Sequence, residues 1–349
     1  MDRGFRDRDY VQTQDNLFFA VVGNVHPKDR VLAYLKYLPS PRGKWGKGSA
    51  RYARSIRYYS ASNIMKTVDY LRSRYPQYVF RFKQSHMVFS AVPHEKIIMH
   101  YRPEERLKAL REAKSPNRLE EKTIRLASLL SDQSGVPPNR LGVTGSILVG
   151  IHTGFSDIDL TVYGAHESRK IKETLLSLYK RNGSPVHRFE GKTLSKWCKE
   201  QASVHPLTVE EARALYARTW NKAVFENRAF SIHPIKIEQD IQFGEELYKP
   251  RKVIEVTAKV VGSSDSCFLP ATYLVTDVRP KMGELNNLKR VVSYEGLYGD
   301  IAGKGDEIKV RGKLEDVMDA SGRLKYRRIL VGSLEARGSD SIKVVSPSH

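Results

Sequence analysis

The first hundred residues alternate between short apolar runs and polar segments rich in glycine and proline. Short apolar runs bounded by turn residues are typical of buried strands. Ser62 precedes Ile64, Val68 and Leu71 at helical spacing and predicts a helix with this serine as its N-cap. Residues 1–14 are polar and charged, and we expect them to form a loose tail. The pattern therefore predicts a separate α/β unit over residues 1–110, with strands at 17–23, 31–37, 78–82 and 97–101.

Helical periodicity dominates the next segment. A helix is expected from Pro103 to Lys114, and a second begins with Ser115 as N-cap and Pro116 at its first position. Thr208 and Glu211 match a capping box and start a later helix. Together with helix 167–180 and a strand at 229–233, these elements predict a second domain over residues 111–248. The apolar face of the second helix is formed by Leu119, Thr123, Leu126 and Leu130.

After Pro250 the pattern changes to five short strand-like runs with turns between them. Many short strands at regular spacing suggest a small barrel, and the OB-fold is the simplest such barrel. We therefore expect an OB-like β-barrel over residues 249–349 and an α+β fold class for the whole chain. The predicted strands are 253–261, 273–278, 290–298, 307–314 and 326–334.

The net charge of +20 in 349 residues adds a functional hint. A surface with this excess of positive charge attracts polyanions and above all nucleic acid. The alternative is a basic protein that binds no nucleic acid. Tyr52, Tyr58 and Tyr59 lie among arginines, which suits stacking on unpaired bases or packing at a helix or loop edge. The predicted barrel carries many cations and could bind a nucleic acid, with Tyr273, Tyr294, Tyr298 and Tyr326 as stacking residues, or serve packing or dimerisation instead. Its cations are Lys259, Arg279, Lys281, Lys289, Arg290, Lys309, Arg311, Lys313, Lys325, Arg327 and Arg328.

Apolar runs long enough to span a bilayer do not occur in the sequence, and the N-terminus has no apolar run of the signal-peptide type. The two cysteines, Cys198 and Cys267, are far apart and lack metal-type spacing. We therefore expect a cytoplasmic protein without membrane association and without a structural disulfide.

Residues 140–163 carry the clearest candidate chemistry. Gly145-Ser146 follows a short predicted strand, and Asp157-Ile158-Asp159 comes after ten intervening residues. Glycine lets a backbone turn tightly and approach a phosphate, whose oxygens accept hydrogen bonds from amides near a helix start. Asp157 and Asp159 alternate with apolar residues, so both carboxylates are expected on one face of a strand, where their oxygens can hold Mg²⁺.

This arrangement resembles the signature of the DNA polymerase beta-type nucleotidyltransferases, and the whole chain resembles predicted archaeal nucleotidyltransferases. The latter resemblance lies in residues 19–27 and 30–37. The resemblance implies a mixed-sheet nucleotidyltransferase core with Gly145 and Ser146 at the triphosphate. It also implies that Asp157 and Asp159 act as catalytic ligands of Mg²⁺ or Mn²⁺.

The activity that this resemblance implies is transfer of a nucleoside monophosphate from an NTP to a hydroxyl, with release of pyrophosphate. The family usually adds a third carboxylate from a neighbouring strand. Here that strand offers Ser231 and His233, with Glu226, Glu238 and Asp240 nearby.

The acceptor remains open at the level of the sequence. The basic charge favours a nucleic acid, RNA more than DNA. Two alternatives are a nucleic-acid-binding protein with a degenerate nucleotidyltransferase domain, and transfer to a protein or a small molecule. The nucleotide and the oligomeric state do not follow from the sequence.

Overall fold

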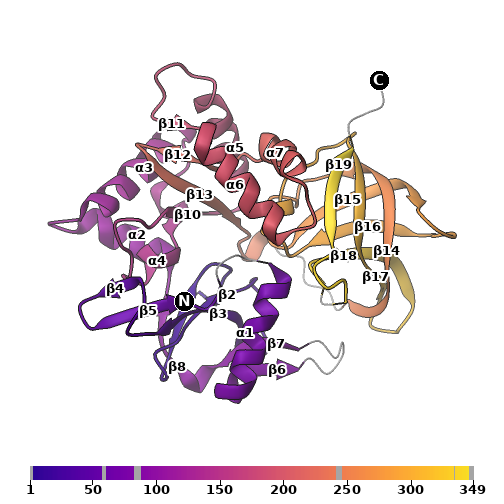
Figure 1. Ribbon diagram of the computed structural model, residues 1–349, viewed down its shortest axis with the longest axis horizontal. Coiled ribbons are helices and arrows are strands. Elements are labelled where there is room, and N and C mark those ends of the chain that lie inside the picture. The colour runs from indigo at the N-terminus through magenta and orange to yellow at the C-terminus, as the bar shows by residue number, and fades with distance from the viewer. Residues whose placement is uncertain (1–2, 57–59, 82–87, 241–245, 334, 346–349) are drawn as a thin grey trace.

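The computed structural model describes residues 3–56, 60–81, 88–240, 246–333 and 335–345. It confirms an α+β fold, with three β-sheets that follow one another along the chain (Figure 1). Among the described residues, no helix is long and apolar enough to cross a membrane.

The first sheet has eight strands and occupies the N-terminal part of the chain. Its path runs β4-β5-β3-β2-β1-β8, while β7 pairs with β3 and β6 with β7. Helix α1 (Ala61–Arg74) covers one face, where Leu71 joins a buried cluster with Phe19 and Leu35. The strands are β1 (Tyr10–Thr13), β2 (Phe18–Val21), β3 (Arg30–Pro39), β4 (Trp45–Lys47), β5 (Ala50–Arg54), β6 (Val79–Arg81), β7 (Val88–Pro93) and β8 (Ile97–Tyr101).

Two sequence predictions about this region are wrong. Residues 3–14 are not a loose tail, because β1 lies inside the sheet between β2 and β8, and Arg3 pairs with both Asp9 and Glu104 at 2.7 and 2.5 Å. The N-cap of α1 is Ser60 rather than Ser62, since the Ser60 side chain accepts a hydrogen bond from the Asn63 N–H.

The second sheet has five strands in the order β11-β12-β13-β10-β9. β10 and β13 are parallel, whereas the other pairs are antiparallel. The strands are β9 (Leu141–Val143), β10 (Ile158–Tyr163), β11 (Val186–His187), β12 (Lys222–Phe225) and β13 (Arg228–Ile235). The helices are α2 (Pro103–Glu112), α3 (Arg118–Ser134), α4 (Gly145–Leu148), α5 (Ala165–Leu178), α6 (Gly191–Val204) and α7 (Val209–Arg218).

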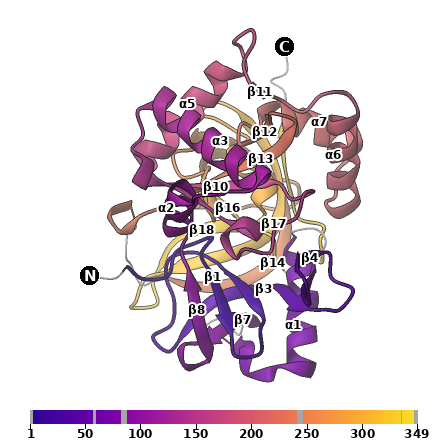
Figure 2. The same ribbon diagram turned by 90° about the vertical axis from the view of Figure 1, so that its left-hand side faces the viewer.

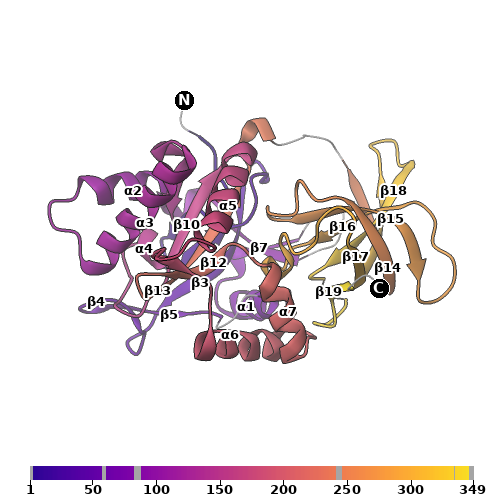
Figure 3. The ribbon, with the colours of Figure 1, turned by 90° about the horizontal axis from the view of Figure 1, so that it is seen from above.

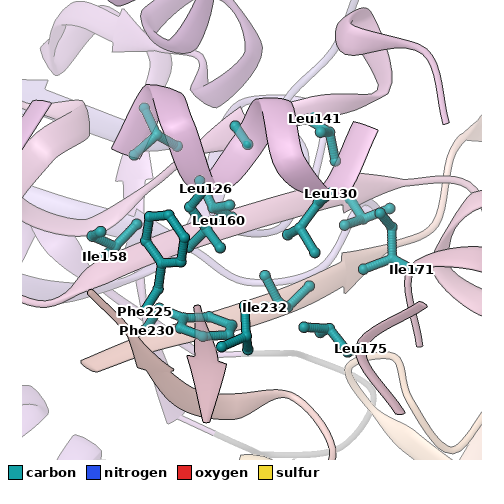
Figure 4. Packing of buried hydrophobic residues seen from close by; sticks show 14 of the residues in the cluster. Leu126, Leu130, Leu141, Ile158, Leu160, Ile171, Leu175, Phe225, Phe230 and Ile232 are labelled. Atoms are coloured by element: carbon teal, nitrogen blue, oxygen red, sulfur yellow. The ribbon is translucent and has the colours of Figure 1, made fainter. Parts of the chain in front are cut away.

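Helices α3 and α5 pack on this sheet through its apolar core. Leu126 and Leu130 of α3 lie against Leu160 of β10, and Ile171 and Leu175 of α5 lie close by (Figure 4). The predicted apolar face of α3 is therefore confirmed. Its start is not, because Asn117 rather than Ser115 is the N-cap and forms a capping box with Glu120.

The third sheet has six strands in the order β14-β15-β16-β18-β17-β19, and an additional β14–β17 pairing closes it into a ring (Figures 1 and 3). β16 and β18 are parallel. Residues 296–298, predicted as the end of a strand, form a short 3₁₀ turn instead. The strands are β14 (Leu247–Gly262), β15 (Ala271–Pro280), β16 (Leu288–Ser293), β17 (Glu307–Met318), β18 (Leu324–Val331) and β19 (Ser341–Val345).

Helix α2 belongs by its contacts to the second sheet. Leu107 and Leu110 are buried in the same cluster as Leu141 of β9. The first sheet thus ends with β8 at Tyr101. The domain boundaries at 110 and 248 stay a prediction, and the sheets themselves span residues 10–101, 141–235 and 247–345.

Candidate active site

Gly145 lies in direct contact with Asp159. β9 and β10 are antiparallel neighbours, and the Thr144 N–H donates to the Asp159 carbonyl oxygen at 2.8 Å. The chain then turns into α4 through Gly145, whose φ is 70°. A Cβ atom at Gly145 would lie 2.6 Å from Oδ2 of Asp159, so a residue with a side chain does not fit without displacing the carboxylate. The fold therefore brings the predicted glycine turn and the predicted acid pair together.

The two acids occupy different environments. Asp159 is the second residue of β10, whereas Asp157 precedes this strand, which begins at Ile158. The prediction that both acids stand within one strand is therefore wrong by one residue at its start. The Asp157 side chain is exposed on the surface. Even so, partial desolvation and the negative charge of Asp159 raise the pKa of Asp157 to about 6.

Ser231 and His233 lie on β13, the neighbouring strand on which the resemblance implies a third carboxylate. Ser231 of β13 is the direct register partner of Asp159 of β10. Its hydroxyl donates a short hydrogen bond to Oδ1 of Asp159. His233 Nε2 lies 2.8 Å from the Ser231 hydroxyl oxygen and 3.7 Å from the same Asp159 oxygen. Position 231 is thus filled by a hydroxyl that holds Asp159, and not by a metal-binding carboxylate.

These contacts keep Asp159 ionised and His233 neutral. Burial would raise the pKa of Asp159, but His233, the Ser231 hydroxyl and the positive charge of Lys36 outweigh it and hold this pKa far below its ordinary value. Burial and the nearby Arg8 charge lower the pKa of His233 to about 4. At neutral pH the site therefore presents at least one permanent carboxylate beside an uncharged imidazole.

The other three acids considered from the sequence serve elsewhere. Glu226 pairs with Arg125 at 2.7 Å, and Glu238 pairs with Arg6 at 2.6 Å. Asp240 accepts a hydrogen bond at 3.2 Å from the first backbone N–H of α5. All three carboxylates are therefore engaged away from the acid pair.

The donor set fits one magnesium ion better than two. Within the described ranges, no group of three or more His, Cys, Asp or Glu side chains is arranged to hold a metal ion. Magnesium, however, is commonly held by one or two carboxylates, with water and substrate phosphates completing its shell. Asp157 and Asp159 can supply such a pair. A second ion would need a further carboxylate, and Ser231 does not provide one.

Cations from two sheets surround the acid pair. Asp7 is the main charge that raises the pKa of Arg8, and Tyr37 is the main group that raises the pKa of Arg54; Asp159 adds to both effects. Asp159 also opposes the burial that lowers the pKa of Lys36. Lys222 of β12 feels both acids, and Arg228 of β13 lowers the pKa of Asp157. Interactions between residues so far apart along the chain leave no periodic pattern in the sequence. The sequence therefore did not predict these cations as part of the site.

The first sheet reaches the site because it packs directly against α4. Leu148, Val149 and Ile151 are buried in one cluster with Tyr10 and Tyr34 of the first sheet. The Gly46 N–H donates to the Ile151 carbonyl oxygen at 2.8 Å. Figure 2 shows the first sheet below the second, and Figure 1 shows α4 next to β4 and β5 of the first sheet. The N-terminal region therefore borders the site on the side of α4.

A cavity lies where the three sheets meet, next to His233. Arg8 of the N-terminal segment and Trp220 before β12 line it together with Phe268 and Asp300 of the third sheet's loops. Asp300 accepts hydrogen bonds from Lys172 and from the Trp220 indole, each at 2.7 Å. These contacts fix the third sheet against the second one beside the site.

The predicted stacking residues of the third sheet are mostly core. Tyr273 and Tyr298 are fully buried and Tyr326 is 8% exposed, whereas Tyr294 is 46% exposed. The expectation that all four could stack on bases is therefore wrong for the buried ones. In the N-terminal region, Tyr52 packs edge-on against Phe18 at 5.1 Å. Residues 57–59, the rest of that predicted cluster, lie outside the described residues.

Comparison with known proteins supplies one relative. The chain is 29% identical over 345 residues to a protein of Methanocaldococcus jannaschii described as the uncharacterized protein MJ1086, covering 97% of this chain and 98% of that protein. Neither a family model nor a solved structure matches the chain.

Proposed function

We propose that the protein is a metal-dependent nucleotidyltransferase that moves a nucleoside monophosphate from an NTP to an acceptor hydroxyl and releases pyrophosphate. The observation that carries this proposal is the contact between Gly145 and Asp159. A left-handed glycine that leaves no room for a Cβ beside an ionised carboxylate creates a place where a phosphate can approach both the backbone and a metal ligand.

Each residue of the site has a role in this reaction. Asp157 and Asp159 would hold Mg²⁺ or Mn²⁺, which supplies charge neutralisation at the phosphates when bound. Gly145 allows the backbone to approach the triphosphate, and Ser146 is the proposed hydroxyl ligand of its oxygens. Ser231 and His233 hold Asp159 ionised and in place. Because catalysis of phosphoryl transfer is mostly positioning and electrostatics, this arrangement contains what the reaction demands of the protein.

A nucleic-acid acceptor, RNA in preference to DNA, fits the surface of the third sheet. Lys249, Lys252, Lys259 and Lys289 are exposed there, and no described acidic side chain pairs with them. The ring of strand pairings, with β16 parallel to β18, supports an OB-like barrel for this part. OB-folds bind single strands through a basic surface and a few aromatic residues, and the exposed Tyr294 offers one such residue.

A transfer assay tests the proposal. The protein is incubated with each α-labelled NTP, Mg²⁺ or Mn²⁺ and a mixed pool of RNA and DNA. We expect label on RNA with the intact protein and at least about a thousandfold less with Asp157→Asn combined with Asp159→Asn. Asp132→Asn, an exposed acid on α3, serves as the matched control and should transfer normally. Undiminished transfer by the double variant would exclude this function.

A second candidate is a nucleic-acid-binding protein whose catalytic site has degenerated. The observation that favours it is Ser231, which occupies the register position opposite Asp159 and engages its carboxylate. This candidate predicts salt-dependent retention of RNA on a filter and no transfer with any metal. Pyrophosphate release that depends on Asp157 would eliminate it.

A further inference from the structure

An exposed aromatic side chain lies beside the acid pair. Phe155 is 55% exposed, whereas every other described phenylalanine and tryptophan is at least partly buried. It precedes Asp157 by two residues, so the Cα atoms of the two residues lie at most about 7 Å apart. Single exposed apolar side chains are common on protein surfaces. The informative feature is therefore the position of this ring next to the proposed metal ligands.

The turn that carries Phe155 is held by its own hydrogen bonds. The Ser156 N–H donates to the Thr153 carbonyl oxygen at 3.0 Å, and the Thr153 N–H donates to the Ser156 hydroxyl oxygen at 3.1 Å. Ser156 itself is buried. Because the turn is already ordered, a ligand that stacks on Phe155 loses little free energy to ordering the protein.

The hairpin of β4 and β5 supports the ring from the first sheet. Trp45 of β4 meets Phe155 edge-on, with ring centroids 5.7 Å apart and planes at 75°. Arg54 of β5 lies over the Trp45 ring at 4.6 Å. The hydrogen bond from the Gly46 N–H to the Ile151 carbonyl oxygen ties the hairpin to the loop that leads to Phe155 (Figure 1). An edge-on neighbour covers only part of a ring, so the rest of Phe155 stays open to a second planar group.

Exposed cations of the same hairpin lie next to this aromatic pair along the chain. Arg42 and Lys44 are exposed, Lys44 directly precedes Trp45, and no acidic side chain of the described residues pairs with either cation. Proteins bind unpaired bases with this combination, in which a ring stacks on the base and cations contact the phosphates. The surface formed by Phe155, Trp45 and the two cations therefore suits the end of a single strand.

We propose that Phe155, supported by Trp45, stacks on the unpaired terminal base of the acceptor strand and so places the terminal hydroxyl of that strand at the acid pair. This inference rests on the proposed function and extends it to the class of acceptor. The acceptor is a nucleic acid with a single-stranded end, and neither a blunt duplex nor a protein. The base of the NTP has the same stacking chemistry, and the experiment below separates the two sources.

Fluorescence anisotropy of a short single-stranded RNA labelled at its 5′ end, with the full-length protein and without NTP or divalent metal, tests this surface apart from catalysis. We expect Phe155→Leu to bind the RNA about five- to a hundredfold more weakly, the effect of losing one base–aromatic stack. Phe155→Trp keeps a flat ring and should bind like the wild type. Tyr70→Leu removes an exposed aromatic side chain from α1 and should leave the affinity within about twofold.

Altered ligands separate this inference from the proposed function. An RNA whose 3′-terminal nucleotide lacks its base should bind the wild type and Phe155→Leu equally, and so should a blunt duplex. Equal binding of the intact strand by the two proteins, or no binding by the wild type, would overturn the inference even if transfer occurs. Weaker binding of a non-hydrolysable NTP analogue by Phe155→Leu, with strand binding unchanged, would assign the ring to the nucleotide instead. Phe155-dependent strand binding in a protein that transfers no nucleotide would support the stacking surface and refute the transfer function.

Discussion

The first and third sheets are both rich in lysine and arginine, but they use these residues differently. In the third sheet, Glu315 is 2% exposed and pairs with Lys313 at 3.2 Å and with Arg328 at 2.8 Å. Near the acid pair, by contrast, the charge of Asp159 acts on Arg8, Lys36 and Arg54, and Arg8 also lies 3.4 Å from Asp7. The number of charges alone therefore does not locate a binding site.

The largest effect on stability is expected from breaking a matched pair of the third sheet. Glu315→Gln leaves the Arg328 guanidinium, whose side chain is 12% exposed, beside an uncharged partner and leaves the buried Lys313 with Glu335, which is half exposed. This should lower the free energy of unfolding by about 3–5 kcal/mol. The exposed pair Arg72–Asp69 on α1 provides the control, and Asp69→Asn should cost less than about 0.5 kcal/mol. Denaturant unfolding measures both. Equal losses would show that the third-sheet charges are not structural.

Gly145→Ala probes the contact between the glycine turn and Asp159. The new Cβ would collide with Asp159 at a left-handed backbone position, so we expect a loss of about 1–3 kcal/mol in stability and at least about a hundredfold loss of transfer. Gly150 has a φ of 71° but no atom within 4 Å of the added Cβ. Gly150→Ala should therefore share the backbone cost alone and keep its activity. Comparable activity in the two variants would argue against a role for the Gly145–Asp159 contact.

The smallest predicted effect is a pH dependence away from the site. Burial lowers the pKa of His205 from 6.5 to about 4, where it packs edge-on against Tyr298 at 5.9 Å. The unfolded chain therefore binds the proton first, and the contribution of His205 to stability falls as the pH drops from about 6.5 towards 4. Between pH 7 and pH 6, the wild type should lose about 0.7 kcal/mol more than His205→Gln. Identical losses would contradict the assignment.

Local signals predicted much of the fold and the centre of the site. The alternation in 158–162, the face of α3 and the capping box at Thr208 depend on neighbours along the chain, and the structure confirms them. The spacing of Gly145 and Asp159 likewise predicted that they belong together, and they do touch. Each of these features follows from periodicity or from the conformational freedom of glycine.

What the sequence did not reveal depends on tertiary pairing. The N-terminal tail looked loose because its charges find their partners, such as Glu104, far along the chain. Tyr273 and Tyr298 looked available for stacking, but the ring of strands closes over them. The cations of the first sheet meet Asp159 only because α4 packs on that sheet, a contact between apolar surfaces with no signal in either segment.

Binding of Mn²⁺ together with a non-hydrolysable NTP analogue can be followed by electron paramagnetic resonance. If Asp157 and Asp159 hold the metal ion at the nucleotide, the wild type binds Mn²⁺ with the analogue and Asp159→Asn loses the ion. Equal Mn²⁺ binding by the wild type and Asp159→Asn would exclude Asp159 as a ligand of the ion.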